Sequence, residues 1–283
     1  MLALLFLLLT ADPRVEIVSA NDTTVVYRER LPPQAVKDPA TGTTKLEPTG
    51  TATRTVQRKP RDPNVVSVLF LGNSLTYFNE TPRMTTLLGA KETRPLRTGS
   101  VTISGATLEQ LWTESPAPAK LWQEHWDYVV VQEQSSTHRN VPRFEKYLQI
   151  FADEARRSGA TPLLFMSWTA PEKVFLTAAK KTNVRVVPIG VAWRALIASG
   201  AFKRLDWDGL HPNLYGSYLI ACSVYATVYG KSPVGVRHTV PKTLADADEE
   251  YDAALVQQTI SPEQALQIQR AAWAAVQKFL PAH

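Results

Sequence analysis

The run Val65-Val66-Ser67-Val68-Leu69-Phe70-Leu71, followed by Gly72-Asn73-Ser74-Leu75, decides the fold of this chain. The first part is apolar and rich in β-branched residues, which predicts a buried strand. Gly72 and Asn73 are residues that favour a turn, and a helical pattern follows them. The stretch therefore predicts a strand that passes directly into a helix, with Ser74 at the junction.

From residue 65 onward, strand-like and helical segments alternate. We expect strands at residues 65–71, 96–103, 128–131, 163–166 and 184–189. We expect helices at residues 84–91, 108–125 (interrupted near Pro116 and Pro118), 143–158, 173–181, 191–199 and 213–229. Nearly continuous apolar strands that alternate with helices are typical of an α/β fold in which helices cover both faces of a parallel sheet.

Polar residues and a glycine follow several of these strands. Ser74, Gly105, the segment 132–134 and the pair Asp208 and His211 all lie just past predicted strands or in loops on that side. In a parallel α/β sheet, ligands bind at the carboxyl ends of the strands. This shared placement is a stronger signal for a functional site than any single motif.

Ser74, Asp208 and His211 are the residue types of a serine hydrolase. A serine hydroxyl is a weak nucleophile until a base takes its proton, and histidine is the usual base. A carboxylate orients the histidine and stabilises its charged form. Two alternatives stay open: Ser74 could merely cap a helix, and Asp208 and His211 could be a chance pair in a surface loop.

The segments around these residues resemble the conserved blocks of the SGNH/GDSL hydrolases. Gly72-Asn73-Ser74-Leu75 resembles the Gly-Asp-Ser-Leu block, with Asn73 in the place of aspartate. Asp208-Gly209-Leu210-His211 resembles the last block, and Ser104-Gly105-Ala106-Thr107 resembles the second. In the third block, Gln132-Glu133-Gln134-Ser135 replaces the usual Gly-x-Asn-Asp. This version is similar to an uncharacterised branch of the superfamily, and the resemblance extends over residues 69–233.

The resemblance implies a three-layer α/β/α sandwich with a parallel, roughly five-stranded, flavodoxin-like sheet. It implies a serine esterase in which Ser74 attacks an ester, His211 is the base and Asp208 orients it. It also implies an oxyanion hole from the N–H groups of Ser74 and Gly105 and the side chain of Gln134, with Gln132 as the alternative to Gln134. Among the substrates of the superfamily, we expect an O-acetyl ester on a carbohydrate. The alternative is a non-catalytic glycan-binding or structural module on the same fold.

The composition limits the other possibilities. The net charge of +5 is modest, and no basic block with interleaved aromatics predicts nucleic-acid binding. Cys222 is the sole cysteine and the five histidines are dispersed, so we expect no disulfide within the chain, no metal site and no cofactor. Cys222 lies in an apolar helical pattern, which predicts a buried residue rather than a nucleophile.

The two ends of the chain differ from the central part. Residues 1–11 resemble a truncated signal peptide, which favours export to the periplasm or beyond over a cytoplasmic location, without stable membrane insertion. Residues 12–63 contain short β-like runs between turn residues, which predict an irregular β-rich arm before a hydrolase domain at residues 64–283. Ser261 and Pro262 predict the start of a last packing helix. The aromatic residues Tyr77, Phe78, Trp112, Trp168 and Trp207 are expected mainly in the core, with a substrate-binding rim as the alternative.

Overall fold

The computed structural model describes residues 15–30, 34–37, 44–47, 50–242 and 256–280. Its central strand is β6 (Val66–Gly72), every residue of which is buried. β6 pairs in parallel with β7 (Leu96–Thr102) on one side and with β8 (Tyr128–Val131) on the other. Beyond β8 lie β9 (Thr161–Phe165) and β10 (Arg185–Val187), also parallel. The expected five parallel strands are confirmed, with boundaries shifted by at most a few residues.

The strand order β10-β9-β8-β6-β7 is that of a flavodoxin-like sheet. The chain runs from β6 outward to β7, and then returns to the other side of β6 to continue through β8, β9 and β10. The segments that follow β6 and β8 therefore lead to helices on opposite faces of the sheet, which is the topological position at which α/β folds bind ligands. Ser74 and Gln132 follow these two strands directly.

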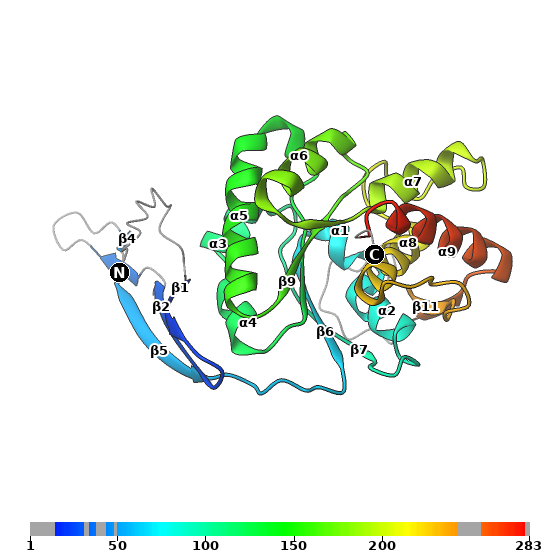
Figure 1. Cartoon of the computed structure of the whole chain (residues 1–283). Helices are drawn as coiled ribbons and strands as arrows, with labels where there is room; N and C mark the ends of the chain where they lie inside the picture. The colour runs from blue at the N-terminus through cyan, green and yellow to red at the C-terminus, as the bar shows by residue number, and fades with distance from the viewer. Residues whose placement is uncertain (1–14, 31–33, 38–43, 48–49, 243–255, 281–283) are drawn as a thin grey trace.

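Successive residues of β6 contribute to two separate cores, one on each face of the sheet. Val68 and Phe70 belong to one cluster of buried residues, and Leu69 and Leu71 belong to the other. This alternation follows from the period of two in a strand. Because both faces are covered by helices, both sets of side chains are apolar, and the strand reads as one apolar run. The three-layer α/β/α arrangement expected from the sequence is confirmed (Figure 1).

The helices divide between the two faces. One face carries α3 (Leu108–Thr113), α4 (Ala117–Gln123), α5 (Val141–Arg157) and α6 (Glu172–Thr182), whose buried residues share a core with Leu69 and Leu71. The other carries α2 (Thr81–Leu88), α7 (Ile189–Ala198), α8 (Leu214–Tyr229) and α9 (Pro262–Gln277). The short helices α1 (Ser74–Tyr77), η1 (Phe78–Glu80) and η2 (Thr137–Arg139) lie after β6 and β8.

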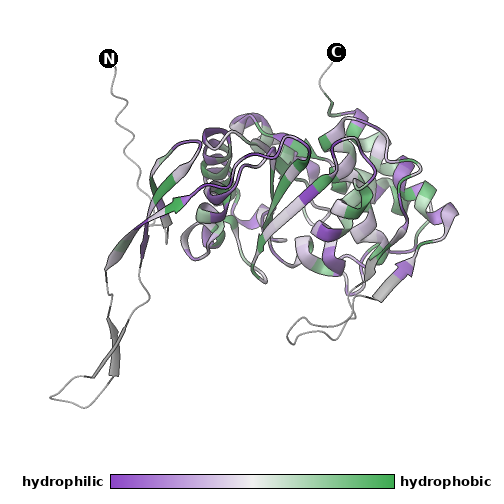
Figure 2. Cartoon of the chain, turned by 90° about the horizontal axis from the view of Figure 1, so that it is seen from below, coloured by the Kyte–Doolittle hydropathy of each residue, from purple (hydrophilic) through white to green (hydrophobic). Residues whose placement is uncertain are grey.

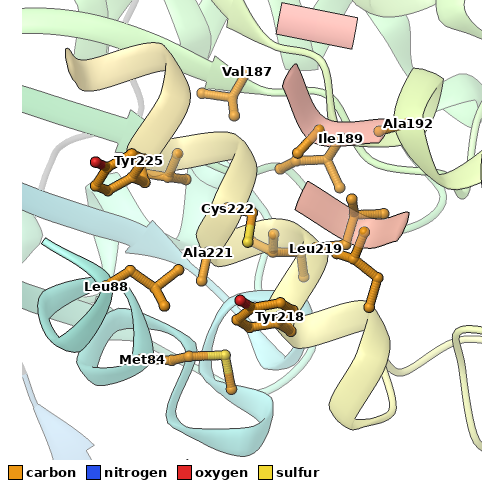
Figure 3. Packing of buried hydrophobic residues seen from close by; sticks show 14 of the residues in the cluster. Met84, Leu88, Val187, Ile189, Ala192, Tyr218, Leu219, Ala221, Cys222 and Tyr225 are labelled. Carbon is orange, nitrogen blue, oxygen red and sulfur yellow. The ribbon is translucent and has the colours of Figure 1, made fainter. Parts of the chain in front are cut away.

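α8 is buried over nearly its whole length, because α2, α7 and α9 surround it on the sheet. Figure 3 shows Tyr218, Ala221 and Cys222 of α8 packed with Met84 and Leu88 of α2. Cys222 is fully buried, as the sequence predicts, and burial raises the pKa of its thiol. Such a thiol stays protonated and acts as a small apolar side chain.

Before the central sheet, β1 (Val15–Ala20), β2 (Thr24–Arg30) and β5 (Thr51–Gln57) form a separate antiparallel sheet. Figure 2 shows it beside the helical layer that carries α4. Val25 and Tyr27 of β2 are buried in the core of that layer. The β-rich character expected here is confirmed, whereas the exact division of the chain at residue 64 stays a prediction.

Two further hairpins pair β3 (Gln34–Lys37) with β4 (Thr44–Glu47), and β11 (Thr239–Lys242) with β12 (Val256–Thr259). The sequence did not predict β11 and β12. The signal-like residues 1–11 lie outside the described residues. In the part of the chain that the structure describes, no helix has the length and apolar character needed to cross a bilayer.

Candidate active site

Residues 72–76, which we call the serine turn, connect β6 to α1. Asn73 caps the helix: its side-chain oxygen accepts a hydrogen bond from the N–H of Leu75 at 3.1 Å. Ser74 is therefore the first residue of the helix, and its hydroxyl is free to face another partner. The alternative that Ser74 merely caps the helix is wrong. The side chain of Ser74 is nearly buried, with 7% of the residue exposed.

The amide of Asn73 also explains why asparagine stands where the resembling block has aspartate. Its nitrogen donates to the backbone oxygen of Ala106 at 2.9 Å, in a buried position. An aspartate carboxylate can only accept hydrogen bonds, so it would face the carbonyl oxygen of Ala106 without a proton between them. Asn73 thus joins the serine turn to the segment that contains Gly105.

Residues 205–212, which we call the histidine loop, lie before α8. Asp208 accepts hydrogen bonds from the backbone N–H of Leu210 at 2.9 Å and of His211 at 2.7 Å, which closes a tight turn. Asp206 accepts from the N–H of Gly209, whose φ of +93° suits glycine. Asn213 then caps α8 and fixes the end of the loop.

The structure brings Ser74, His211 and Asp208 together. His211 Nε2 lies 3.0 Å from Ser74 Oγ, and His211 Nδ1 lies 2.6 Å from Asp208 Oδ2. Partial burial opposes ionisation of Asp208, but the hydrogen bonds from the His211 ring and from the two backbone N–H groups outweigh it and lower the pKa of Asp208 to about 2. The ionised carboxylate only accepts, so Nδ1 carries the ring proton and Nε2 is left to accept the proton of Ser74.

Two buried contacts that the sequence did not predict hold the histidine loop in place. The indole N–H of Trp168, which follows β9, donates to the backbone oxygen of Leu210 at 3.2 Å. The side chain of Asn79, 6% exposed, donates to the backbone oxygen of Pro212 at 3.1 Å and to the hydroxyl of Ser217 at 2.9 Å. Asn79 follows α1, so it ties the serine turn's own helix to the far end of the histidine loop.

Asn79 and the next residue, Glu80, both adopt the left-handed conformation, with φ of +51° and +52°. This conformation is uncommon outside glycine and costs on the order of 1 kcal/mol per residue. The strained pair turns the chain between α1 and α2, and it places the Asn79 amide against the loop. A local strain is thus offset by hydrogen bonds that position the site.

Aromatic rings flank His211. The ring of Phe78 stacks on the imidazole, with centroids 4.4 Å apart and planes 15° apart. Tyr77 and Trp207 each stack with Phe78, at centroid distances of 5.6 and 6.4 Å. Trp207 is 47% exposed, which contradicts a core position. Trp112 and Trp168 instead pack against Phe151 and Trp193, as expected of core residues.

Gly105 and Gln134 lie side by side at the same edge of the sheet. Gly105 has a φ of +64°, and the side-chain amide of Gln134 donates to its backbone oxygen at 3.1 Å. Thr107 caps α3 in a reciprocal pair with Gln110. Within the described residues, the N–H groups of Ser74 and Gly105 have no hydrogen-bond partner.

Gln132, the alternative to Gln134, is occupied in the interior. It is 1% exposed, and its oxygen accepts from the N–H of Asn73 and from the hydroxyl of Thr76, both at 2.8 Å. Its nitrogen donates to the backbone oxygen of Glu133. The oxygen of this amide holds the serine turn and its nitrogen is bonded to the adjacent backbone, which leaves Gln134 as the glutamine whose amide faces Gly105.

Glu133 is a buried carboxyl group behind these two segments. It is 2% exposed and accepts from the N–H of Gln134 at 2.8 Å and of Leu108 at 3.4 Å. Burial is the dominant influence, and it raises the pKa of Glu133 in spite of these N–H groups and the charge of Arg143. Glu133 therefore joins the Gly105 segment to the Gln134 segment at some cost in desolvation.

Metal ligands do not cluster in the described part of the chain, where no group of three or more His, Cys, Asp or Glu residues could hold an ion. The cavities of 560 to 680 Å³ described in this structure lie elsewhere, and neither Ser74 nor His211 lines them. The side chains of His211 and Asp208 are 22% and 31% exposed, so the site opens directly to solvent.

Solved structures are similar to this chain to different degrees. A DUF4886 family protein from Bacteroides uniformis aligns with a TM-score of 0.59 and 17% identity, over 75% of this chain and 95% of that one. A protein named provisionally as an SGNH hydrolase, from Slackia heliotrinireducens, aligns with a TM-score of 0.48 and 26% identity, over 57% of this chain and 97% of that one. A catalytic mutant of an acetylxylan esterase from Geobacillus stearothermophilus aligns with a TM-score of 0.44 and 19% identity, over 61% and 97%.

The first of these likenesses shows the fold alone. No protein-family model and no curated protein matches the chain.

Proposed function

We propose that this protein is a serine hydrolase that cleaves a carboxylic ester through an acyl-enzyme. The observation that supports this most is the chain of contacts from Ser74 Oγ through both nitrogens of His211 to Asp208, at 3.0 and 2.6 Å. Distances of this size allow a proton to pass from the hydroxyl to the imidazole. The buried caps around Ser74 hold the hydroxyl at the open edge of the sheet.

In the first half of the reaction, Ser74 Oγ attacks the ester carbonyl carbon while His211 Nε2 takes its proton. The carbonyl oxygen becomes an oxyanion, and the charge on the imidazolium is balanced by Asp208. The tetrahedral intermediate then breaks its bond to the alcohol oxygen, and His211 returns the proton to that oxygen. The products of this half are the free alcohol and an acyl group on Ser74.

In the second half, water attacks the acyl group as His211 takes a proton from it. The bond to Ser74 Oγ then breaks, the proton returns to Ser74, and the carboxylic acid leaves. The same three residues therefore serve both halves, and the net reaction consumes one water for each ester.

The oxyanion needs hydrogen-bond donors that are already in place. The N–H groups of Ser74 and Gly105 are the proposed backbone donors, and the amide of Gln134 is the proposed third donor. Gln134 uses one amide hydrogen for Gly105 and has a second one left for the oxyanion. Loss of one such donor typically costs about 3–4 kcal/mol of transition-state stabilisation.

Within this reaction class, we propose an O-acetyl ester on a carbohydrate as the substrate. The resemblance of the motifs to the SGNH/GDSL hydrolases supports this class, and so does a site that is open rather than enclosed. A panel of acetylated sugars, compared with esters of longer acyl chains, measures the preference directly.

Hydrolysis of p-nitrophenyl acetate by the wild type and by Ser74→Ala tests the proposal. We expect the substitution to lower kcat by about 10⁴- to 10⁶-fold, because the nucleophile is removed. A fluorophosphonate probe should label the wild type but not the variant. Ser232→Ala, which changes a serine far from the site, serves as the matched control and should keep both activity and labelling.

Equal, background-level turnover by the wild type and Ser74→Ala would contradict the proposal and favour the non-catalytic module. Labelling that persists in Ser74→Ala would place the reactive serine elsewhere in the chain.

A further inference from the structure

The proposed reaction fixes which side of Ser74 the alcohol occupies. His211 Nε2 must return its proton to the oxygen of the departing alcohol, so this oxygen has to lie close to the imidazole. Gly105 and Gln134, the proposed oxyanion donors, belong to other segments of the sheet edge. Groups that surround His211 therefore contact the alcohol part of the ester rather than the acyl part.

The ring of Phe78 stacks on His211, and Tyr77 and Trp207 each stack on Phe78; we call these three aromatic residues the aromatic shelf. The planes of Tyr77 and Trp207 lie 21° and 26° from that of Phe78, and Phe78 lies 15° from the imidazole. Each of these rings is thus roughly parallel to that of Phe78. The shelf is close to the proposed catalytic groups along the chain as well, because Tyr77 and Phe78 come three and four residues after Ser74 and Trp207 precedes Asp208.

Trp207 is the exposed member of the shelf. It is 47% exposed, and the other exposed large hydrophobic side chains within the described residues are aliphatic. Its backbone N–H donates to the backbone oxygen of His211 at 3.1 Å, which fixes the residue beside the histidine. Its indole N–H has no hydrogen-bond partner in the part of the chain that the structure describes. Trp207 therefore stacks on Phe78 within the fold and still presents about half of its surface to solvent.

We propose that the aromatic shelf binds the alcohol part of the substrate, and that this alcohol is a pyranose ring of a carbohydrate. The proposal rests on the esterase function proposed above, and it assigns the selection of the alcohol to Trp207. A pyranose presents a face of C–H groups that stacks on a flat aromatic ring, and its hydroxyl groups accept hydrogen bonds from an indole N–H. An open shelf also admits a ring that belongs to a longer chain.

Two acetate esters that differ only in the alcohol test the shelf: a mono-O-acetylated methyl xylopyranoside and ethyl acetate. We expect Trp207→Ala to lower kcat/KM for the xyloside by about five- to ten-fold. The loss for ethyl acetate should be clearly smaller, because ethyl acetate has no ring that could stack on Trp207. Leu176→Ala, an exposed apolar residue on α6, is the control and should change neither value. Replacing the acetyl group of the xyloside by butyryl should leave the effect of Trp207→Ala unchanged.

Equal losses on both esters would overturn the proposal, since Trp207 would then support the histidine loop. The proposal would also be overturned if Trp207→Ala lowered kcat/KM by clearly different factors for the acetyl and butyryl esters of the xyloside.

Binding without turnover separates this proposal from the esterase function. Saturation-transfer NMR with unacetylated methyl xylopyranoside should give a signal with the wild type and with Ser74→Ala, and a much weaker one with Trp207→Ala. Absence of the signal from Ser74→Ala would overturn the shelf even if ester hydrolysis is established. Conversely, failure of the wild type to hydrolyse either ester would overturn the esterase function, and the shelf would then be retained only as a sugar-binding surface if the signal is present.

Discussion

The serine turn and the histidine loop meet at 3.0 Å, yet they are held in different ways. Residues 72–76 are all buried, and their polar groups are bonded to β8 and to the Gly105 segment. The histidine loop carries its carboxylate and imidazole 31% and 22% exposed, and hydrogen bonds from Trp168, Asn79 and Asn213 to its backbone oxygens hold it. Damage to the serine turn should therefore reduce stability and activity together, whereas damage to the loop should reduce mainly activity.

The largest expected effect comes from Asp208→Asn in the histidine loop. The amide oxygen can still accept from the N–H groups of Leu210 and His211, so the turn should persist. The wrong tautomer of His211 is then favoured, and we expect kcat to fall by about 10⁴-fold. The free energy of unfolding, measured by urea denaturation at pH 7, should fall only modestly, through loss of the contribution that the lowered pKa of the ionised Asp208 makes to the folded state. A loss of stability that parallels the loss of kcat would erase the distinction between the two regions.

The next largest effect is expected in the serine turn, from Gly72→Ala. A Cβ at this position would lie 2.4 Å from Thr76 Oγ1 and 2.5 Å from Gln132 Oε1, which is too close for any real contact. Such overpacking typically lowers the free energy of unfolding by about 1–3 kcal/mol. Because the displaced groups hold the serine turn, esterase activity should fall as well. Denaturation and kinetics on the same sample measure both, and full activity at reduced stability would show that the turn tolerates strain.

Glu133→Gln tests whether the buried carboxyl group between the Gly105 and Gln134 segments makes the stability of the protein depend on pH. The pKa of Glu133 is raised in the folded state, so the folded protein binds this proton more tightly than the unfolded chain. The free energy of unfolding should therefore fall as pH rises from the ordinary value of 4.5 through the raised pKa. One proton contributes a slope of at most about 1.4 kcal/mol per pH unit.

Glu133→Gln lacks this proton, so the stability difference between wild type and variant should change with pH in that window and level off above it. Urea denaturation over a pH series gives the difference, which also cancels the titration of Glu109 and other groups common to both proteins. A difference that is independent of pH would show that Glu133 does not titrate there.

The smallest effect is expected from Trp168→Phe. The ring still stacks on Trp193, but the hydrogen bond to Leu210 is lost. A single hydrogen bond of this kind is worth about 0.5–1.5 kcal/mol, so we expect kcat to fall by about two- to ten-fold. The midpoint of thermal unfolding should stay close to that of the wild type. A large fall in the midpoint with kcat unchanged would show that Trp168 contributes to core packing and does not position the histidine loop.

The difference between contacts that are local in sequence and contacts that are distant explains which features the sequence could predict. The strands follow from runs of β-branched residues, and Ser74, Asp208 and His211 follow from residue types at short spacing. Asn79 and Trp168 gave no such signal, because their partners lie 133 and 42 residues away. Both Asn73 and Ser74 are good capping residues, and the choice between them depends on Gln132 and Ala106, which are distant in sequence. The exposure of Trp207 likewise depends on how the loop folds back over α8.

The separation of Ser74 from His211, 137 residues along the chain, has a consequence for synthesis. A ribosome adds about 5–20 residues per second, so roughly 7–30 s pass between the appearance of the nucleophile and that of its base. During this time the emerging polypeptide contains a serine with no partner to activate it. Under the proposed function, hydrolysis can begin only after His211 has been made and placed beside Ser74, so a shorter nascent chain would leave esters intact.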